Sequence, residues 1–291
     1  GDDVRVLLRP GSDRAHLDAL RQGAQVERVL GDLTDAASLA AAVRGVAVVY
    51  HAAARVADHG SRRQFYQANV EGTRELLAAA RAAGVARFVY VSSPSVVATG
   101  EDQVRIDESV PYPKRPLNLY CETKAQAERL VLTADAPGFT TCAIRPRGVW
   151  GPRDLRGAIA KLLAKMRAGK LPDLSGGRTL WASLCHCDNA AAACLLAARA
   201  AGVGGKAYFI TDGEDVDTWA FVRGLAATFG VTPPTRRPNP RVLDAAAALL
   251  DLVWRLPPLA HHRSPPLSRY SLSLLARTGT YDISAAVRDL G

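Results

Sequence analysis

Short apolar runs alternate with longer amphipathic segments through the first half of the chain. Residues 46–50, Val-Ala-Val-Val-Tyr, are apolar at every position, as is typical of a parallel strand buried on both faces. Strands that alternate with helices predict an α/β fold with a doubly wound parallel sheet. The predicted strands are 4–8, 26–30, 46–50, 85–91 and 139–144, and the predicted helices are 13–21, 35–43, 62–83 and 119–133.

The pattern changes after about Arg147. Residues 233–240 contain four prolines and predict a linker, which leads into the apolar stretch 242–256. We therefore divide the chain into a sheet domain, 1–150, and a smaller lobe, 151–291, some of whose elements return to the main sheet. The predicted helices here are 158–168, 188–201 and 218–229, and the predicted strands are 171–174, 179–184 and 207–210.

Two helix ends carry local signals. Thr34 is the expected N-cap of helix 35–43, because its hydroxyl is suited to accept from a free amide of the first turn. Gly84 is expected to end helix 62–83, because glycine adopts the left-handed conformation that follows many helices.

Composition narrows the class of protein. The chain has 291 residues, 48% of them hydrophobic, so it is long enough to bury one large core and an added lobe. Its net charge of +9 comes mostly from dispersed arginines, with no block of five like charges. We therefore expect no nucleic-acid partner. A basic balance instead suits small anionic ligands or a lipid surface.

The cysteines predict neither a disulfide framework nor a metal site. They are Cys121, Cys142, Cys185, Cys187 and Cys194, and their spacing favours reduced thiols in a cytoplasmic protein. Two of them flank His186, but no second pair of ligands has zinc-like spacing, so we expect no metal. The printed sequence shows no signal peptide and no apolar run of membrane-spanning length.

Tyr120 and Lys124 are the main candidates for chemistry. Residues four apart lie one turn apart on the same face of a helix. A tyrosine hydroxyl, with an ordinary pKa near 10, is a poor acid or base at neutral pH. An adjacent ammonium favours the phenolate, so we expect Lys124 to lower the pKa of Tyr120.

Further residues accompany this pair. An apolar strand runs into Ser92 and Ser93, and Asn69 begins the segment Asn-Val-Glu-Gly-Thr upstream. Together these residues resemble the catalytic set of the extended short-chain dehydrogenase/reductase family, part of the NAD-dependent epimerase/dehydratase superfamily. The resemblance implies a Rossmann-like fold and a nicotinamide cofactor.

The resemblance also implies a role for each residue of the set. Tyr120 is the general acid/base, and Lys124 lowers its pKa and hydrogen-bonds the nicotinamide ribose. Ser93 hydrogen-bonds the reacting oxygen, and Asn69 supports the geometry of the site. Ser95 is either a second polar contact for the substrate or a loop hydroxyl bonded to backbone.

Cofactor contacts follow the ends of the predicted strands. Arg9 and Ser12 follow the first strand, where an acidic residue would favour NAD, so we predict a preference for NADP(H), with NAD(H) as the alternative. Asp32 and Leu33 match the adenine contact of the family. The alternatives are that Arg9 is only a solvated residue at a strand end and that Asp32 and Leu33 belong only to the start of a helix.

The remaining cofactor and substrate segments come from the resemblance alone. His51, Ala52 and Ala53 match a small-residue loop that the cofactor approaches closely, whereas Pro146 and Val149 match a segment that lines the nicotinamide and the substrate. The glycine-rich turn of the family is missing. The chain start matches the second strand of that fold, so we expect the first strand and glycine-rich loop upstream of Gly1, and weak dinucleotide binding by the 291 residues alone.

One reaction of the superfamily is not expected here, and three functions remain. Dehydratases place an Asp-Glu pair after the catalytic hydroxyl, whereas Pro94 and Ser95 follow Ser93 in this chain, so we do not expect dehydration. The C-terminal segments resemble the 3β-hydroxysteroid dehydrogenase branch, which includes bacterial 2-alkyl-3-oxoalkanoate reductases. We therefore predict an NADP(H)-dependent oxidoreductase that interconverts a secondary alcohol and a ketone on a bulky apolar small molecule. A nucleotide-sugar epimerase and a non-catalytic dinucleotide-binding sensor are the alternatives.

Two questions stay open in the sequence. The stretch 242–259 is too short and too interrupted by charged residues to span a bilayer. It is either an ordinary core-packing helix or a segment that covers a large apolar substrate or lies on a membrane surface. The family resemblance implies a homodimer formed through helices 62–83 and 119–133.

Overall fold

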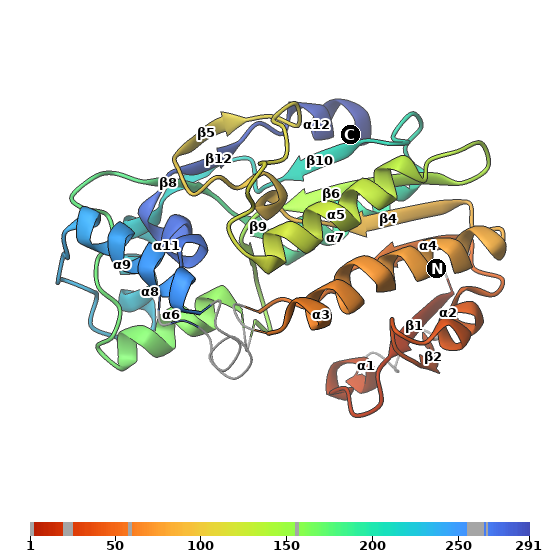
Figure 1. Ribbon diagram of the computed structural model, residues 1–291, viewed down its shortest axis with the longest axis horizontal. Coiled ribbons are helices and arrows are strands. Elements are labelled where there is room, and N and C mark those ends of the chain that lie inside the picture. Colours follow the sequence, from red (N-terminus) through yellow and green to blue (C-terminus); the bar gives the residue numbers. More distant parts are fainter. Residues whose placement is uncertain (1–2, 20–25, 58–59, 155–156, 255–264, 266) are drawn as a thin grey trace.

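A computed structural model describes residues 3–19, 26–57, 60–154, 157–254, 265 and 267–291. Its main sheet has four parallel strands in the order β10-β6-β4-β3 (Figure 1). They are β3 (Val48–His51), β4 (Arg87–Val91), β6 (Thr140–Pro146) and β10 (Ala207–Ile210).

A separate parallel pair precedes this sheet. It joins β1 (Val4–Leu8) to β2 (Val26–Leu30), with Leu8 opposite Leu30. Among the described strands β1 and β3 share no hydrogen-bonded ladder, and this break lies where the family resemblance places a further strand. The helix between β1 and β2 is α1 (Ala15–Ala19), and residues 20 and 21 of the predicted helix lie outside the described residues.

Alternate residues of β4 enter two hydrophobic cores, one on each face of the sheet. Phe88 and Tyr90 pack with α2, α4 and α5, whereas Val89 packs with α7 and α12. A period of two is expected of a strand that is covered on both faces. The predicted doubly wound α/β fold is therefore confirmed. The helices are α2 (Ala36–Val43), α4 (Gly72–Ala82), α5 (Leu119–Thr133), α7 (Cys187–Arg199) and α12 (Ser284–Leu290).

A second sheet lies in the lobe, in the order β11-β8-β12-β5. β5 comes from the first half of the chain, directly after the loop that carries Ser93, so this loop is tied to the lobe. The division at residue 150 stays a prediction. The strands are β5 (Gln103–Ile106), β8 (Trp181–Ser183), β11 (Asp215–Asp217) and β12 (Gly279–Tyr281), and β7 (Val149–Trp150) pairs separately with β9 (Cys185–His186).

Four helices of the described part of the lobe surround a third core, which includes Met166, Leu180, Trp219 and Leu272. Pro233, Pro234 and Pro238 lie in an irregular segment, as predicted, whereas Pro240 is the first residue of the helix that the following apolar stretch forms. The helices are α6 (Ala158–Arg167), α8 (Thr218–Thr228), α9 (Pro240–Val253) and α11 (Arg269–Ala276).

Two local predictions are wrong. The N-cap of α2 is Asp35, which accepts from the Ala37 amide, because the hydroxyl of Thr34 donates instead to the Asp32 carboxylate. Residues 171–174 form no strand, although Leu171 and Leu174 are buried in the lobe core. Pro172 lies between them and has no amide hydrogen for a ladder.

The predicted helix 62–83 is continuous but not uniformly α-helical. It begins as α3 (Arg62–Phe65), becomes a π-helix over Tyr66–Glu71 and continues as α4. Gly72 allows the close approach of the loop after β2, because a Cβ there would lie 2.8 Å from the Cβ of Leu33. Gly84 follows with φ of +74°, which confirms its role at the helix end. The strands β5 and β12 were not predicted.

Candidate active site

Ser93 lies where β4 ends, at the carboxyl edge of the main sheet. It is the N-cap of a short 3-10 helix over Pro94–Val97, and its hydroxyl accepts from the Ser95 amide at 3.2 Å. The Ser92 amide donates to the Ile144 carbonyl of β6 at 2.7 Å, which fixes the strand end beneath the loop. The carboxyl edge of a parallel sheet is the usual place for a ligand site in such folds.

Tyr120 lies in the first turn of α5, close to this serine loop. The N-cap Asn118 accepts from the Cys121 amide at 2.9 Å and so sets where the helix begins. Withdrawal from water raises the pKa of Tyr120, while the nearby hydroxyls of Ser93 and Ser95 act to lower it. The phenol is therefore protonated at neutral pH.

Lys124 is almost completely buried, one turn after Tyr120. Its ammonium donates to the Val91 carbonyl at 2.8 Å and lies 4.0 Å from the centre of the Tyr90 ring. Burial lowers the pKa of Lys124 to about 7, and Glu128 opposes that change. The described contacts that lower the pKa of Tyr120 are the two serine hydroxyls, and the expected effect of Lys124 on that pKa stays a prediction.

Glu128 continues the same face of α5 one turn beyond Lys124. Its fully buried carboxylate accepts from two nitrogens of Arg145, at 2.7 and 3.0 Å, and from the Tyr112 hydroxyl at 2.7 Å. A buried ion pair of this kind needs such additional hydrogen bonds to offset desolvation. Sequence reasoning missed this pair. The spacing of Tyr120, Lys124 and Glu128 places Glu128 on the same helix face, but it does not indicate Arg145 on β6 as the partner.

Asn69 lies in the π-helical segment and has its side-chain amide fully engaged. Its oxygen accepts from the Arg55 amide at 2.6 Å, and its nitrogen donates to the Arg55 carbonyl at 3.2 Å and to the Thr123 hydroxyl at 3.0 Å. Both amide hydrogens are thus used within the protein. Asn69 joins the loop after β3 to α5, and π-helical turns often occur at functional sites.

His51, at the end of β3, is a buried and neutral part of the same network. Thr73 donates its hydroxyl hydrogen to the Asn69 carbonyl at 2.7 Å, so it accepts from Nε2 of His51 at 2.9 Å. Burial, with the nearby charge of Lys124, lowers the pKa of His51 to about 3. Ala52 and Ala53 follow it with exposed surfaces at the sheet edge.

Arg9 and Ser12 form a tight turn after β1. The Ser12 amide donates to the Arg9 carbonyl at 3.1 Å, with Pro10 second and Gly11 third at φ of +79°, which is the arrangement of a type II turn. Arg9 is exposed, and its charge helps to lower the pKa of Asp32, after the larger effect of hydrogen bonds from Thr34.

The remaining predicted residues lie on the substrate side. Pro146 ends β6 opposite Ile210, and Val149 is 45% exposed on β7. Ser95 is buried near enough to Tyr120 to lower its pKa, yet its hydroxyl completes no hydrogen bond with the described residues. From the lobe, Tyr270 of α11 brings its ring to 6.2 Å from that of Tyr120, a neighbour that the sequence did not predict.

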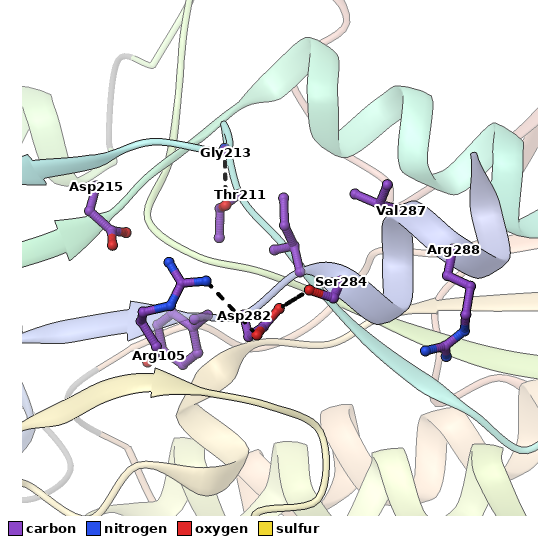
Figure 2. A pocket seen from close by; sticks show the side chains of 10 residues that line it. Arg105, Thr211, Gly213, Asp215, Asp282, Ser284, Val287 and Arg288 are labelled. Carbon is purple, nitrogen blue, oxygen red and sulfur yellow. Dashed lines mark hydrogen bonds and ion pairs between the residues drawn. The ribbon is translucent and has the colours of Figure 1, made fainter.

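A separate cavity of about 310 Å³ lies between β5, β12 and α12 (Figure 2). Figure 2 shows Asp282 between Arg105 and Ser284, and the arginine lies 3.9 Å from its carboxylate. Ser93, Tyr120 and Lys124 do not line it. The charged groups that line this cavity are partly paired with one another, and none of the three candidate catalytic residues is among them. We therefore take the carboxyl edge of the main sheet as the candidate active site.

Two further features concern metals and membranes. All five cysteines are free. Among the described residues, the one group with three close ligand atoms is His186, Cys187 and Asp188, where the Asp188 amide already donates to Nδ1 of the histidine.

Within the described ranges, no helix combines the length and apolar character needed to cross a bilayer.

The fold and the comparisons with known proteins show an oxidoreductase of the extended short-chain dehydrogenase/reductase class, which acts on CH–OH groups. The chain belongs to the 3-beta hydroxysteroid dehydrogenase/isomerase family, whose model matches residues 3–241.

Three known proteins illustrate the similarity. A 4-hydroxy-2-methyl-3-oxo-4-farnesyl-3,4-dihydroquinoline-1-oxide ketoreductase of Stigmatella aurantiaca is 40% identical over 291 residues, which are 100% of this chain and 84% of that protein. A 2-alkyl-3-oxoalkanoate reductase of Shewanella oneidensis is 34% identical over 91% of this chain and 71% of its own length. The crystal structure of gox2253 superposes with a TM-score of 0.76 at 26% identity, covering 99% of this chain and 84% of that chain.

Proposed function

We propose that this protein is an NADP(H)-dependent ketoreductase that reduces a carbonyl on a bulky apolar small molecule. The observation that carries the proposal is the Tyr120 phenol, held protonated beside the Ser93 hydroxyl at the carboxyl edge of β4. A general acid that is protonated at the working pH suits carbonyl reduction, which consumes a proton at oxygen.

The residues at the ends of β1 and β3 fit a dinucleotide. Arg9 presents an exposed, turn-supported guanidinium suited to a 2′-phosphate, and Ala52 and Ala53 leave the edge after β3 free of bulky side chains. Asp32 and Leu33 are proposed at the adenine, and Lys124 and Pro146 at the nicotinamide end. A bound nicotinamide dinucleotide supplies the hydride.

Each polar residue of the site has its own proposed role in the reduction. Tyr120 donates its hydroxyl proton to the developing alkoxide, and Ser93 donates a hydrogen bond to the same oxygen. The buried ammonium of Lys124 stabilises the phenolate that remains, and Asn69 and Glu128 hold α5 in place. Ser95 and Val149 are proposed as substrate contacts.

The proposed substrate class rests on the lobe and on the relatives. Tyr270 brings an aromatic ring to the site from α11, whose Leu272 and Ala276 pack in the apolar lobe core, and this suits a large hydrocarbon body rather than a sugar diphosphate. The two sequence relatives carry the names of reductases for a farnesylated quinoline and for a 2-alkyl-3-oxoalkanoate. We also propose the homodimer through α5 and the 62–82 helix, which a molecular-mass measurement in solution tests.

The test follows NADPH absorbance in the natural protein with a long-chain 2-alkyl-3-oxo acid, and NADP-linked oxidation of a 3β-hydroxysteroid. Tyr120→Phe is the control in each assay, and activity lost in that variant supports the proposal. Copurified sugar nucleotide with tightly held NAD would favour the epimerase. NADPH binding without turnover on any carbonyl compound would favour the sensor.

A further inference from the structure

Tyr120, Lys124 and Glu128 lie on successive turns of one face of α5. Glu128 is 0% exposed and Lys124 only 2%, so an ammonium and a carboxylate are both withdrawn from water. Residues four apart on a helix are neighbours. The Tyr90 ring of β4 packs against this face, with its centre 4.0 Å from the ammonium. The ammonium is therefore enclosed together with a carboxylate, one turn beyond the candidate catalytic tyrosine.

Two partners outside α5 hold the Glu128 carboxylate. Both of its oxygens accept from Arg145 of β6, at 2.7 and 3.0 Å, and one of them also accepts from the Tyr112 hydroxyl at 2.7 Å. A two-fold arginine–carboxylate pair has a defined geometry as well as a strong attraction. Arg145 is the charged group that β6 brings here, and it is paired with the carboxylate. The pair thus fixes a negative charge one turn from Lys124.

Glu128 is the group that carries the opposite charge beside Lys124. The titratable groups that face Lys124 among the described residues are His51 of β3, Tyr90 of β4, and Tyr120 and Glu128 of α5. Burial lowers the pKa of His51 to about 3 and raises the pKa of both tyrosines, so these three groups are neutral at neutral pH. The attraction on the ammonium therefore comes from Glu128.

This attraction matters because burial works against the charged form of an amine. Burial lowers the pKa of Lys124 to about 7 although Glu128 acts to raise it. Without the carboxylate, the amine would be mostly neutral at neutral pH. A neutral amine would not stabilise the phenolate that is left when Tyr120 gives up its proton.

We propose that Glu128 is a positioning residue that keeps the Lys124 amine charged at the working pH, so that the ammonium is available to the phenolate of Tyr120. Arg145 and Tyr112 support this role, because they hold the carboxylate in place. The role goes beyond tying α5 to β6, since it depends on the charge of Glu128 and not only on its hydrogen bonds. Its part in catalysis rests on the proposed function, whereas its effect on Lys124 does not.

Glu122 offers a matched control on the same helix. Its carboxylate also accepts from an arginine and a tyrosine, namely from Arg62 at 2.6 and 3.3 Å and from Tyr66 at 2.6 Å. It lies two positions before Lys124, on another face of α5, and Arg62 is 64% exposed. Glu128→Gln and Glu122→Gln thus remove the same charge from the same kind of pair, but only Glu128 faces Lys124.

The first experiment is urea unfolding of the natural protein from about pH 5 to about pH 10.5, which needs no substrate. The wild type, Glu128→Gln and Glu122→Gln are each compared with the same chain that also carries Lys124→Met, so that the difference reports Lys124 alone. A further comparison uses Glu128→Leu with Arg145→Met. This double variant leaves no unpaired charge of the pair, and it serves where Glu128→Gln does not fold.

We expect the contribution of Lys124 to stability to rise from about pH 7 upward in the wild type. In both Glu128 variants this rise should begin about one pH unit lower, because the folded state then releases the proton more readily. Glu122→Gln should behave like the wild type. An unchanged starting pH in the Glu128 variants overturns the proposal, as does an equal shift in Glu122→Gln. A shift in Glu128→Gln that the double variant lacks would assign the effect to an unpaired Arg145 and equally overturn it.

The second experiment tests the consequence for catalysis with a carbonyl compound that the wild type reduces. The kcat of reduction should fall as pH rises through the pKa of Lys124, and Glu128→Gln should move this fall about one pH unit lower. A shift in unfolding without a shift in the rate profile would overturn the catalytic role of Glu128. If the wild type turns over no carbonyl compound, the proposed function fails, while the unfolding experiment still decides whether Glu128 sets the charge of Lys124.

Discussion

The side-chain amide of Asn69 donates a hydrogen bond to the hydroxyl oxygen of Thr123 over 3.0 Å. Thr123 precedes Lys124 in α5, and its own hydroxyl donates to the Leu119 carbonyl at 2.7 Å. This contact joins α5 to the π-helical segment. Because both hydrogens of the Asn69 amide are used within the protein, we infer that Asn69 positions α5 and does not touch the substrate.

Thr123→Val tests this positioning. The change leaves a buried amide hydrogen of Asn69 without an acceptor, so we expect a loss of about 1–3 kcal/mol in the free energy of unfolding and a lower kcat. The matched control is Thr133→Val, at the exposed end of α5, where the hydroxyl makes the same bond to the carbonyl one turn earlier. That control should stay within about 0.5 kcal/mol of the wild type. Equal effects of both changes on kcat would refute the role of Asn69.

The stability of the protein should fall in mild acid because of His51. Burial lowers the pKa of His51 to about 3 in the folded state, whereas the unfolded value is about 6.5. Between these values the unfolded state binds more protons, so stability is lost as pH falls from about 6.5 to about 3. The upper bound of this loss is about 5 kcal/mol. Urea unfolding across this range should show a shallower pH dependence in His51→Gln, and an identical slope would contradict the prediction.

The stability of the protein should rise between neutral and alkaline pH because of Lys124. Burial lowers the pKa of Lys124 to about 7, from an ordinary value of 10.5. The unfolded state therefore binds more protons between these values, and stability should rise as pH increases from about 7 to about 10.5. Lys124→Met should remove this rise and abolish activity. The measurement is urea unfolding from neutral to alkaline pH; a rise that persists in the variant would assign it to other groups.

The sequence predicted the main sheet and its helices well, because their apolar patterns are long and regular. The ends of α5, Leu119 and Thr133, and the strands β1, β2 and β10 have the predicted bounds. The strands β5 and β12 were missed because they are short and pair across 176 positions of the chain, from Gln103 to Gly279 (279 − 103). Such pairing depends on tertiary contacts that local patterns do not contain.

For the candidate site, too, the sequence predicted the local features and missed those that depend on tertiary packing. The sequence placed Ser93, Tyr120 and Lys124 on the right elements, since strand ends and helix spacing are local properties. It did not predict that Lys124 would bond the Val91 carbonyl, because the depth of the side chain is set by packing around Tyr90. Nor did it predict Tyr270, which lies 150 positions after Tyr120 and reaches it only through the lobe.

Removing one partner of the buried ion pair between Glu128 and Arg145 should lower the free energy of unfolding more than replacing both partners with apolar residues. Arg145→Met alone leaves a buried carboxylate whose remaining partner is Tyr112, so we expect a loss of about 3–5 kcal/mol in the free energy of unfolding. Adding Glu128→Leu should restore at least about 1 kcal/mol of that loss. Arg74→Met, which breaks an exposed ion pair with Glu71, should cost less than about 1 kcal/mol. Additive losses in the double variant would contradict a coupled pair.

Tyr270 should determine how well a bulky substrate is held against the catalytic tyrosine. Its ring lies 6.2 Å from that of Tyr120, at an angle of 54°, on a helix anchored in the lobe core by Leu272 and Ala276. Tyr270→Ala removes an aromatic contact worth about 0.5–1.5 kcal/mol and opens the site, so kcat/KM for a bulky ketone should fall roughly tenfold.

The size of the substrate separates a specific contact from general damage to the lobe. Tyr270→Ala should raise the KM of the bulky ketone much more than that of a small ketone, and Tyr270→Phe should behave nearly like the wild type, because the ring supplies the contact. Phe229→Ala, at a half-exposed position after α8, should change neither constant. If Tyr270→Ala lowers kcat equally for both ketones and leaves KM unchanged, the ring acts on Tyr120 itself and the lobe does not select the substrate at this position.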